Sequence, residues 1–163
     1  MIERKQETKK LFEVCSLRKT PIMTFINKMD REGRSAFDLL EEIEQVLGIA
    51  TYPMTWPIGS GDIFQGVYHR KTKELILYEK DQDRSKKISL KGLSLNDPSI
   101  EKIIGKEAHQ ELLEEIELLE GAGDDFDHER YLKGELAPVF FGSALNNFGV
   151  QTLLEELIDI SPP

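Results

Sequence analysis

Residues 21–30 read PIMTFINKMD, an apolar run that ends in a polar segment of the form N-K-x-D. A second apolar run, residues 138–142, leads into Ser143, Ala144 and Leu145. Continuous apolar runs of this length favour parallel strands that are covered on both faces. Because the carboxyl ends of parallel strands meet at one edge of a sheet, we expect the two polar segments to lie together at that edge.

The N-K-x-D pattern predicts a loop that reads a guanine base. Guanine presents two adjacent donors, N1–H and the N2 amine, and the single carboxylate of Asp30 can accept both. Asn27 is expected to tie the loop together and to reach the N7 side of the base, while the aliphatic stem of Lys28 lies along the ring. Ala144 is expected to donate its backbone N–H to guanine O6, and the Ser143 hydroxyl to brace Asp30.

An alternative interpretation is that the polar residues of the first loop only cap the helix that follows. The tetrapeptide alone favours that alternative. The Ser143–Ala144 element reverses the balance, because it appears in the right order and at the end of a second buried run.

A site that hydrolyses GTP also needs a phosphate loop of the form G-x-x-x-x-G-K-[ST]. The nearest match, residues 61–66, is followed by Val67 and Tyr68 where a Lys and a Ser or Thr are required. We therefore expect the chain to carry only the base-reading half of a nucleotide site, with catalytic residues and the Mg²⁺ site outside it. The three histidines are isolated in sequence and indicate no metal site: His69, His109 and His128.

The fold class expected is α/β, with a partial parallel sheet of the P-loop GTPase type and an inserted α+β subdomain. A strand–helix–strand unit needs about 30 residues, whereas residues 31–142 separate the two loops. A helix begins near Ser35, ends at Gly48 and completes the ordinary unit. We expect residues 1–48 and 136–163 to form the C-terminal half of a GTPase domain, and residues 49–135 to form the insertion.

Within the insertion, three short runs predict a mostly antiparallel sheet: residues 54–58, 66–69 and 75–78. Residues 96–98 then open one long helix that carries apolar residues at helical spacing as far as Leu119 and stops at Gly121. A short helix over 126–132 leads to the second buried run, and a last helix is expected over 150–160.

The net charge of −9 argues against a direct grip on nucleic acid, which requires a basic face. Acidic clusters such as residues 41–44 and 114–117 are interpreted as solvated helix faces. No apolar stretch is long enough to span a bilayer, and the charged beginning of the sequence does not resemble a secretory signal. These features predict a cytoplasmic protein that does not associate with membranes.

Together, these motifs resemble the bacterial peptide-chain release factor 3 family, translational GTPases related to elongation factor G. The resemblance runs in order along nearly the whole chain. It rests on NKMDR at 27–31, WPIGSG at 56–61 with Phe64, GVY at 66–68, PVFFGSA at 138–144 and NFGV at 147–150. The six residues that match the guanine-binding motifs of the family without departure are Asn27, Lys28, Asp30, Ser143, Ala144 and Leu145.

The resemblance implies a parent protein that binds GTP or GDP, acts on the terminating ribosome and recycles the release factors that read stop codons. It implies that the inserted subdomain faces the ribosomal stalk protein. Two alternatives stay open: a fragment of an elongation-factor-G-like translocase, and a protein-interaction module without enzymatic activity. The chain alone, without a phosphate loop, is expected to be inactive.

Overall fold

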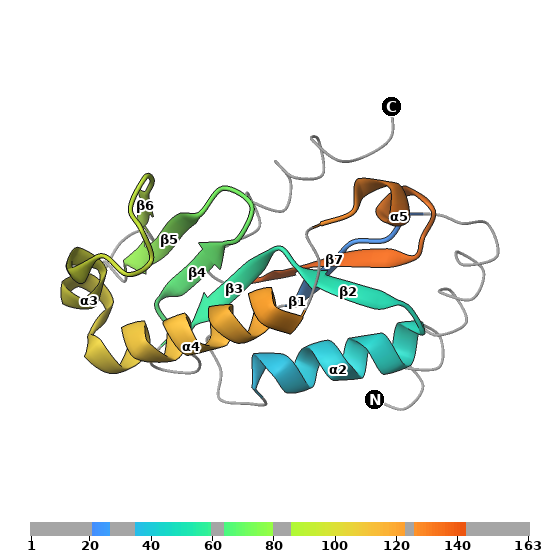
Figure 1. The fold of residues 1–163 in the computed structure, drawn as a ribbon, viewed down its shortest axis with the longest axis horizontal. Helices are drawn as coiled ribbons and strands as arrows, with labels where there is room; N and C mark the ends of the chain where they lie inside the picture. Colours follow the sequence, from blue (N-terminus) through green and yellow to red (C-terminus); the bar gives the residue numbers. More distant parts are fainter. Residues whose placement is uncertain (1–20, 27–34, 60–63, 80–85, 123–125, 143–163) are drawn as a thin grey trace.

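A computed structural model describes residues 21–26, 35–59, 64–79, 86–122 and 126–142. The fold is α/β, as predicted, and contains a parallel sheet and an antiparallel sheet (Figure 1). Its elements in chain order are β1 (Thr24–Ile26), α2 (Ala36–Leu47), β2 (Ala50–Pro53), β3 (Thr55–Ile58), β4 (Gly66–His69), β5 (Glu74–Glu79), β6 (Lys86–Leu90), α3 (Pro98–Ile104), α4 (Lys106–Ala122), α5 (His128–Leu132) and β7 (Leu136–Phe141).

The parallel sheet has the strand order β1-β7-β2, so β7 fills the position between two strands that precede it by many residues. Both neighbours run parallel to β7, with Phe25 opposite Phe140 and Tyr52 opposite Pro138. All six residues of β7 are buried, which explains its unbroken apolar sequence. The prediction that the two apolar runs form neighbouring parallel strands is confirmed.

Helix α2 connects β1 to β2, and its predicted ends are confirmed. The Ser35 side chain accepts a hydrogen bond of 3.3 Å from the Asp38 N–H at the beginning. Gly48 ends the helix in the left-handed region at φ 70° and donates its N–H to the Glu44 carbonyl at 2.8 Å. The Glu44 carboxylate accepts from the backbone N–H and the hydroxyl of Thr51, at 3.1 and 2.8 Å, and so ties α2 to β2.

The antiparallel sheet has the order β3-β4-β5-β6. Its first three strands correspond to the three predicted runs, whereas β6 was not predicted. One part of the expected insertion pairs elsewhere: β2, within residues 49–135, lies in the parallel sheet beside β7. The chain therefore passes from one sheet to the other around Met54, whose N–H donates to the Val139 carbonyl at 2.8 Å.

The single long helix predicted after residue 96 is wrong, because the structure contains two helices, α3 and α4, separated at Gly105. This residue has φ 97° and ψ 154°, a conformation outside the helical region that glycine tolerates. The apolar spacing gave no sign of the break, because Ile100 and Ile104 before it and Leu112 and Ile116 after it are all buried.

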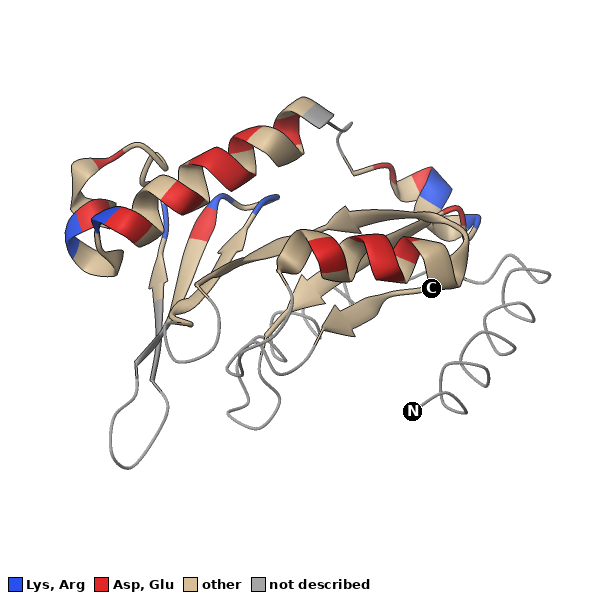
Figure 2. Cartoon of the chain, turned by 90° about the horizontal axis from the view of Figure 1, so that it is seen from below, with Lys and Arg blue, Asp and Glu red and all other residues tan. Residues whose placement is uncertain are grey.

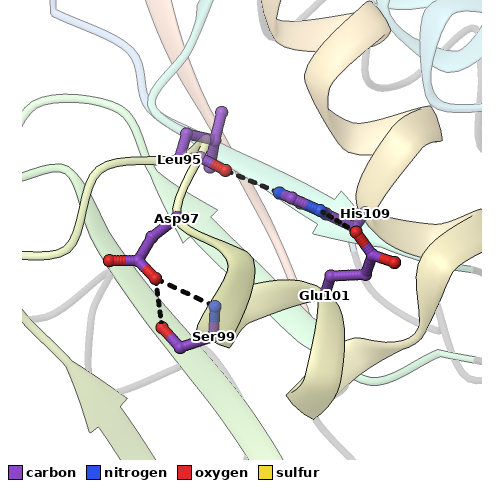
Figure 3. Close-up of polar contacts among 5 residues, drawn as sticks. All are labelled: Leu95, Asp97, Ser99, Glu101 and His109. Carbon is purple, nitrogen blue, oxygen red and sulfur yellow. Dashed lines mark hydrogen bonds and ion pairs between the residues drawn. The ribbon is translucent and has the colours of Figure 1, made fainter.

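Side chains around the break hold the start of both helices (Figure 3). The Asp97 carboxylate caps α3 by accepting from the Ser99 N–H at 2.9 Å and the Ser99 hydroxyl at 2.7 Å. On α4, the buried His109 ring contacts the Leu95 carbonyl through Nε2 at 2.6 Å. A carbonyl only accepts, so Nε2 carries the proton of that bond. His109 Nδ1 lies 3.9 Å from the Glu101 carboxylate on α3.

Trp56 joins the two sheets and two helices in one core. It is fully buried, and its ring packs 4.7 Å from Phe37 of α2 and 5.5 Å from Phe141 of β7, between ring centroids. Its Nε1–H donates to the Glu115 carboxylate on α4.

Acidic residues follow one another along α2 and α4, which lie on the same side of the molecule (Figure 2). The two helices carry these acidic residues: Asp38, Glu41, Glu42, Glu44, Glu107, Glu111, Glu114, Glu115, Glu117 and Glu120. Within the part of the chain that the structure describes, none of the helices is both long and apolar enough to cross a bilayer.

We expect Gly66→Ala to lower the free energy of unfolding by about 2–4 kcal/mol. Gly66 has φ +155°, and an added Cβ would lie 2.2 Å from the Ile76 carbonyl oxygen and 2.9 Å from the Leu77 Cα. Gly121→Ala is the matched control, since its Cβ meets open space in a helix and should stabilise by up to about 1 kcal/mol. Urea denaturation of both variants tests this, and equal stabilities would contradict it.

We expect Glu115→Gln to flatten the dependence of stability on pH. Burial raises the pKa of the Glu115 carboxyl above its ordinary 4.5; the hydrogen bond from Trp56 lowers it, and the charge of Glu111 adds to the rise. The folded state thus holds this proton more tightly than the unfolded chain. Its contribution to the free energy of unfolding is largest below pH 4.5 and declines as pH rises through the raised folded-state pKa.

The glutamine keeps an oxygen acceptor for Trp56 but carries no charge, so the Glu115→Gln protein should lack that decline and be at least as stable at neutral pH. Glu117→Gln, on the exposed side of α4, controls for the loss of one negative charge. Chemical denaturation between about pH 4 and 8 gives the comparison. If the free energy of unfolding of the Glu115→Gln protein depended on pH as steeply as that of the wild type, the raised pKa of Glu115 would not be the cause of the pH dependence.

Candidate functional site

The six residues of the predicted guanine site lie outside the described part of the chain: Asn27, Lys28, Asp30, Ser143, Ala144 and Leu145. The structure does describe the strands that lead directly into both segments. The carboxyl ends of these strands fix the position at which each predicted segment begins.

The ends of β1 and β7 lie side by side at one edge of the parallel sheet. Ile26, the last residue of β1, stands opposite Phe141, the last residue of β7. The pairing continues one step further, because the Gly142 N–H donates to the Ile26 carbonyl at 3.1 Å. The residues immediately before the two predicted loops are thus hydrogen-bonded neighbours.

On its other side, the carboxyl end of β7 is bonded to β3 rather than to β2. The pairing of β2 with β7 ends with Pro53 opposite Val139. Beyond that point, the Thr55 hydroxyl accepts a hydrogen bond of 2.8 Å from the buried Phe141 N–H. The end of β7 is therefore bonded to β1 on one side and to a side chain of β3 on the other.

Sequence reasoning missed Thr55. The residues Met54, Trp56 and Ile58 form the apolar phase of an alternating run, and Thr55 occupies the polar phase, which normally faces solvent. In the structure Thr55 is 1% exposed, because β7 covers that side of β3. The only signal in the sequence was that Thr55, on the polar side of the alternating run, has a hydroxyl that can accept a hydrogen bond.

The described histidines take part in local structure. His69 is buried in β4, and its Nδ1 accepts a hydrogen bond of 3.3 Å from the Thr72 N–H. His109 is buried against Leu95 at the junction of α3 and α4. Across the described ranges, no group of three or more His, Cys, Asp or Glu residues is arranged to hold a metal ion.

A groove with a volume of about 610 Å³ lies between α2, β2 and α4. Apolar side chains of both helices line it, including Phe37 and Leu118, together with Glu41, Arg70 and Arg130. The Arg70 guanidinium lies 4.5 Å from the Tyr52 ring centroid and donates to the Pro53 carbonyl at 3.0 Å. The groove reaches Leu136 at the start of β7, so it lies away from the carboxyl edge where the two loops begin.

Comparison with known proteins agrees with this arrangement. The model of the elongation factor Tu GTP binding domain matches residues 3–163. Peptide chain release factor 3 of Symbiobacterium thermophilum is 46% identical over 156 residues, which cover 96% of this chain and 30% of that relative. The chain thus spans about 30% of the length of this curated relative. With its parallel sheet and a family match over almost all its residues, the chain belongs to the elongation factor Tu GTP-binding domain family.

Proposed function

We propose that this chain recognises the guanine base of GTP or GDP at the common carboxyl edge of β1 and β7. The observation that carries the proposal is the pairing of Ile26 with Phe141, extended by the 3.1 Å bond from the Gly142 N–H to the Ile26 carbonyl. Asn27 follows Ile26 and Ser143 follows Gly142, so both loops start from adjacent positions. Open α/β sheets bind their ligands beyond this edge.

The proposed roles follow from the chemistry of guanine. Asp30 accepts from N1–H and the N2 amine, and the Ala144 N–H donates to O6. Asn27 and Lys28 support the base and ribose side, and the Ser143 hydroxyl braces Asp30. Leu145 completes the second loop. An adenine would leave the Asp30 carboxylate without its matching donors, and such mismatches discriminate by up to about 10⁴-fold.

We propose that the chain functions as part of a longer GTPase that supplies the phosphate loop, the Mg²⁺ site and the catalytic residues. The match to 30% of the related release factor supports this. Residues 1–48 and 136–163 would form the GTPase half and residues 49–135 the inserted subdomain. The pairing of β2 with β7 favours adding Ala50–Pro53 to the GTPase half, with the junction near Met54.

We propose that the parent protein acts in the cytoplasm as a translation termination factor that promotes recycling of stop-codon-reading release factors on the ribosome. The support is the 46% identity to a protein named peptide chain release factor 3. The inserted subdomain is proposed to face the ribosomal stalk protein. Because acidic residues line α2 and α4 (Figure 2), contact with ribosomal RNA is assigned to other parts of the parent.

Two alternatives are distinguished by experiment. A translocase related to elongation factor G would share the guanine loops but would drive movement of the ribosome along messenger RNA rather than release-factor recycling. A protein-interaction module would bind no nucleotide in any context. Release of a stop-codon-reading factor from terminated ribosomes, measured with the full-length protein and GTP, separates both from the proposed function.

In the full-length protein that contains this sequence, we expect Asp30→Asn to exchange guanine preference for xanthine preference. The xanthine C2 oxygen matches the amide donor of Asn, whereas the guanine N2 amine loses its acceptor. GDP affinity should fall on the order of 10²-fold or more while xanthosine diphosphate affinity rises. Fluorescence displacement with both nucleotides measures the change.

Asp97→Asn is the matched control for this experiment. Asp97 caps α3, and asparagine caps a helix equally well, so this variant should keep the wild-type preference for GDP. Unaltered guanine preference in Asp30→Asn would show that Asp30 does not contact the base.

The chain expressed alone should bind fluorescent GDP far more weakly than micromolar and show no GTP turnover. Most nucleotide affinity comes from the phosphates and Mg²⁺, and their proposed partners belong to the longer protein. Fluorescence anisotropy, with the full-length protein as the positive control, gives the test. Micromolar affinity of the chain alone would overturn the proposed division of the nucleotide site.

A further inference from the structure

Thr55 belongs to both sheets at once. Its backbone pairs with His69 in the antiparallel sheet, while its side chain reaches the parallel sheet and accepts from the Phe141 N–H at 2.8 Å. Thr55 is 1% exposed, so no solvent competes for this bond.

The hydroxyl of Thr55 stands where a backbone acceptor is missing. The last pair between β2 and β7 is Pro53 with Val139, after which the chain turns away into β3 (Figure 1). Phe141 lies two residues further along β7, and its N–H faces the side that β2 has left. A buried N–H without an acceptor is costly, and the Thr55 hydroxyl supplies the acceptor that β2 does not.

The hydrogen bond between Thr55 and Phe141 holds the last residue of β7, just before the second predicted loop segment begins. The Phe141 N–H points to Thr55, and the next N–H, that of Gly142, points to the Ile26 carbonyl on β1. Successive amides are thus fixed from opposite sides just before Ser143. The residue next to Thr55 is held in the core, because Trp56 is fully buried and donates a hydrogen bond to Glu115 of α4.

We propose that Thr55 is a positioning residue for guanine recognition, whose hydroxyl holds the end of β7 so that the Ala144 N–H meets guanine O6. The proposal rests on the guanine-binding function proposed above. Hydrogen bonds weaken steeply when their angle departs from linearity. A shift of β7 after loss of the Thr55 bond would therefore weaken the O6 contact directly, whereas the Asp30 contacts, which come from the segment after β1, would be affected only through the proposed Ser143 brace.

The test uses three nucleotides and the full-length protein that contains this sequence. GDP has every recognition group, 6-thio-GDP replaces O6 by a weakly accepting sulfur, and inosine diphosphate lacks only the N2 amine. In the wild type both analogues should bind more weakly than GDP. Each ratio of dissociation constants reports one contact: the sulfur analogue reports the Ala144 contact, and inosine diphosphate the Asp30 contact.

Thr55→Val keeps the shape of the side chain and removes the acceptor. We expect GDP to bind about 3- to 30-fold more weakly, with the 6-thio-GDP to GDP ratio shrinking toward one and the inosine diphosphate to GDP ratio changing less. Thr55→Ser, which keeps the hydroxyl, should stay within about twofold of the wild type for all three nucleotides. If the valine variant does not fold, Thr55→Cys makes the same comparison, because a thiol is a weak acceptor.

Val67→Ala separates positioning from plain loss of stability. Val67 is a fully buried residue of β4, so truncating it lowers the melting temperature without removing the bond to Phe141. Both nucleotide ratios should remain as in the wild type. If Thr55→Val also kept the wild-type ratio of dissociation constants for 6-thio-GDP and GDP, the proposed role of Thr55 would be overturned.

The outcome for the wild type distinguishes the two proposals. If the wild type fails to prefer GDP over either analogue, guanine recognition itself is wrong, and the role of Thr55 fails with it. If the wild type discriminates and Thr55→Val discriminates equally well, guanine recognition stands and only the role of Thr55 is refuted.

Discussion

The pairing of β7 with β1 is the constraint on which the rest of this structure depends. Strand β1 has only three residues, and its neighbour in the parallel sheet is β7, which follows it after a long intervening stretch of chain. The strand–helix–strand unit formed by β1, α2 and β2 leaves a position open between its strands, and β7 occupies it. Closing so long a loop costs conformational entropy, which the complete burial of β7 offsets.

This arrangement explains why the antiparallel sheet packs as part of the same core. The chain leaves the parallel sheet at Met54 and must return to its middle at Leu136. Trp56 joins the two parts through Phe141 of β7 and Phe37 of α2, and through its bond to Glu115 of α4. Residues of both sheets accordingly belong to one buried cluster, so the core is continuous across the junction.

The same constraint connects the fold to its family. In open α/β sheets the ligand lies beyond the carboxyl ends of the strands, and the chain brings two such ends together at Ile26 and Phe141. The membership in the elongation factor Tu GTP-binding domain family fits a nucleotide edge of this kind. The residues proposed to contact a base follow directly after these two strands, whose paired ends determine where the following segments begin.

The sequence by itself determined the features that depend on neighbouring residues. Ser35, Gly48 and Asp97 marked helix ends because capping is local chemistry, and the apolar runs of β1 and β7 predicted buried parallel strands. Only the tertiary structure decided the features that depend on distant contacts. The break at Gly105 was hidden because the buried positions keep their helical spacing across it, and β2 joined the parallel sheet because β7 offered it a partner. Thr55 carries a polar side chain in the usual solvent-facing phase of its strand, yet it is buried, because β7 approaches from far along the chain and needs the acceptor that β2 no longer provides.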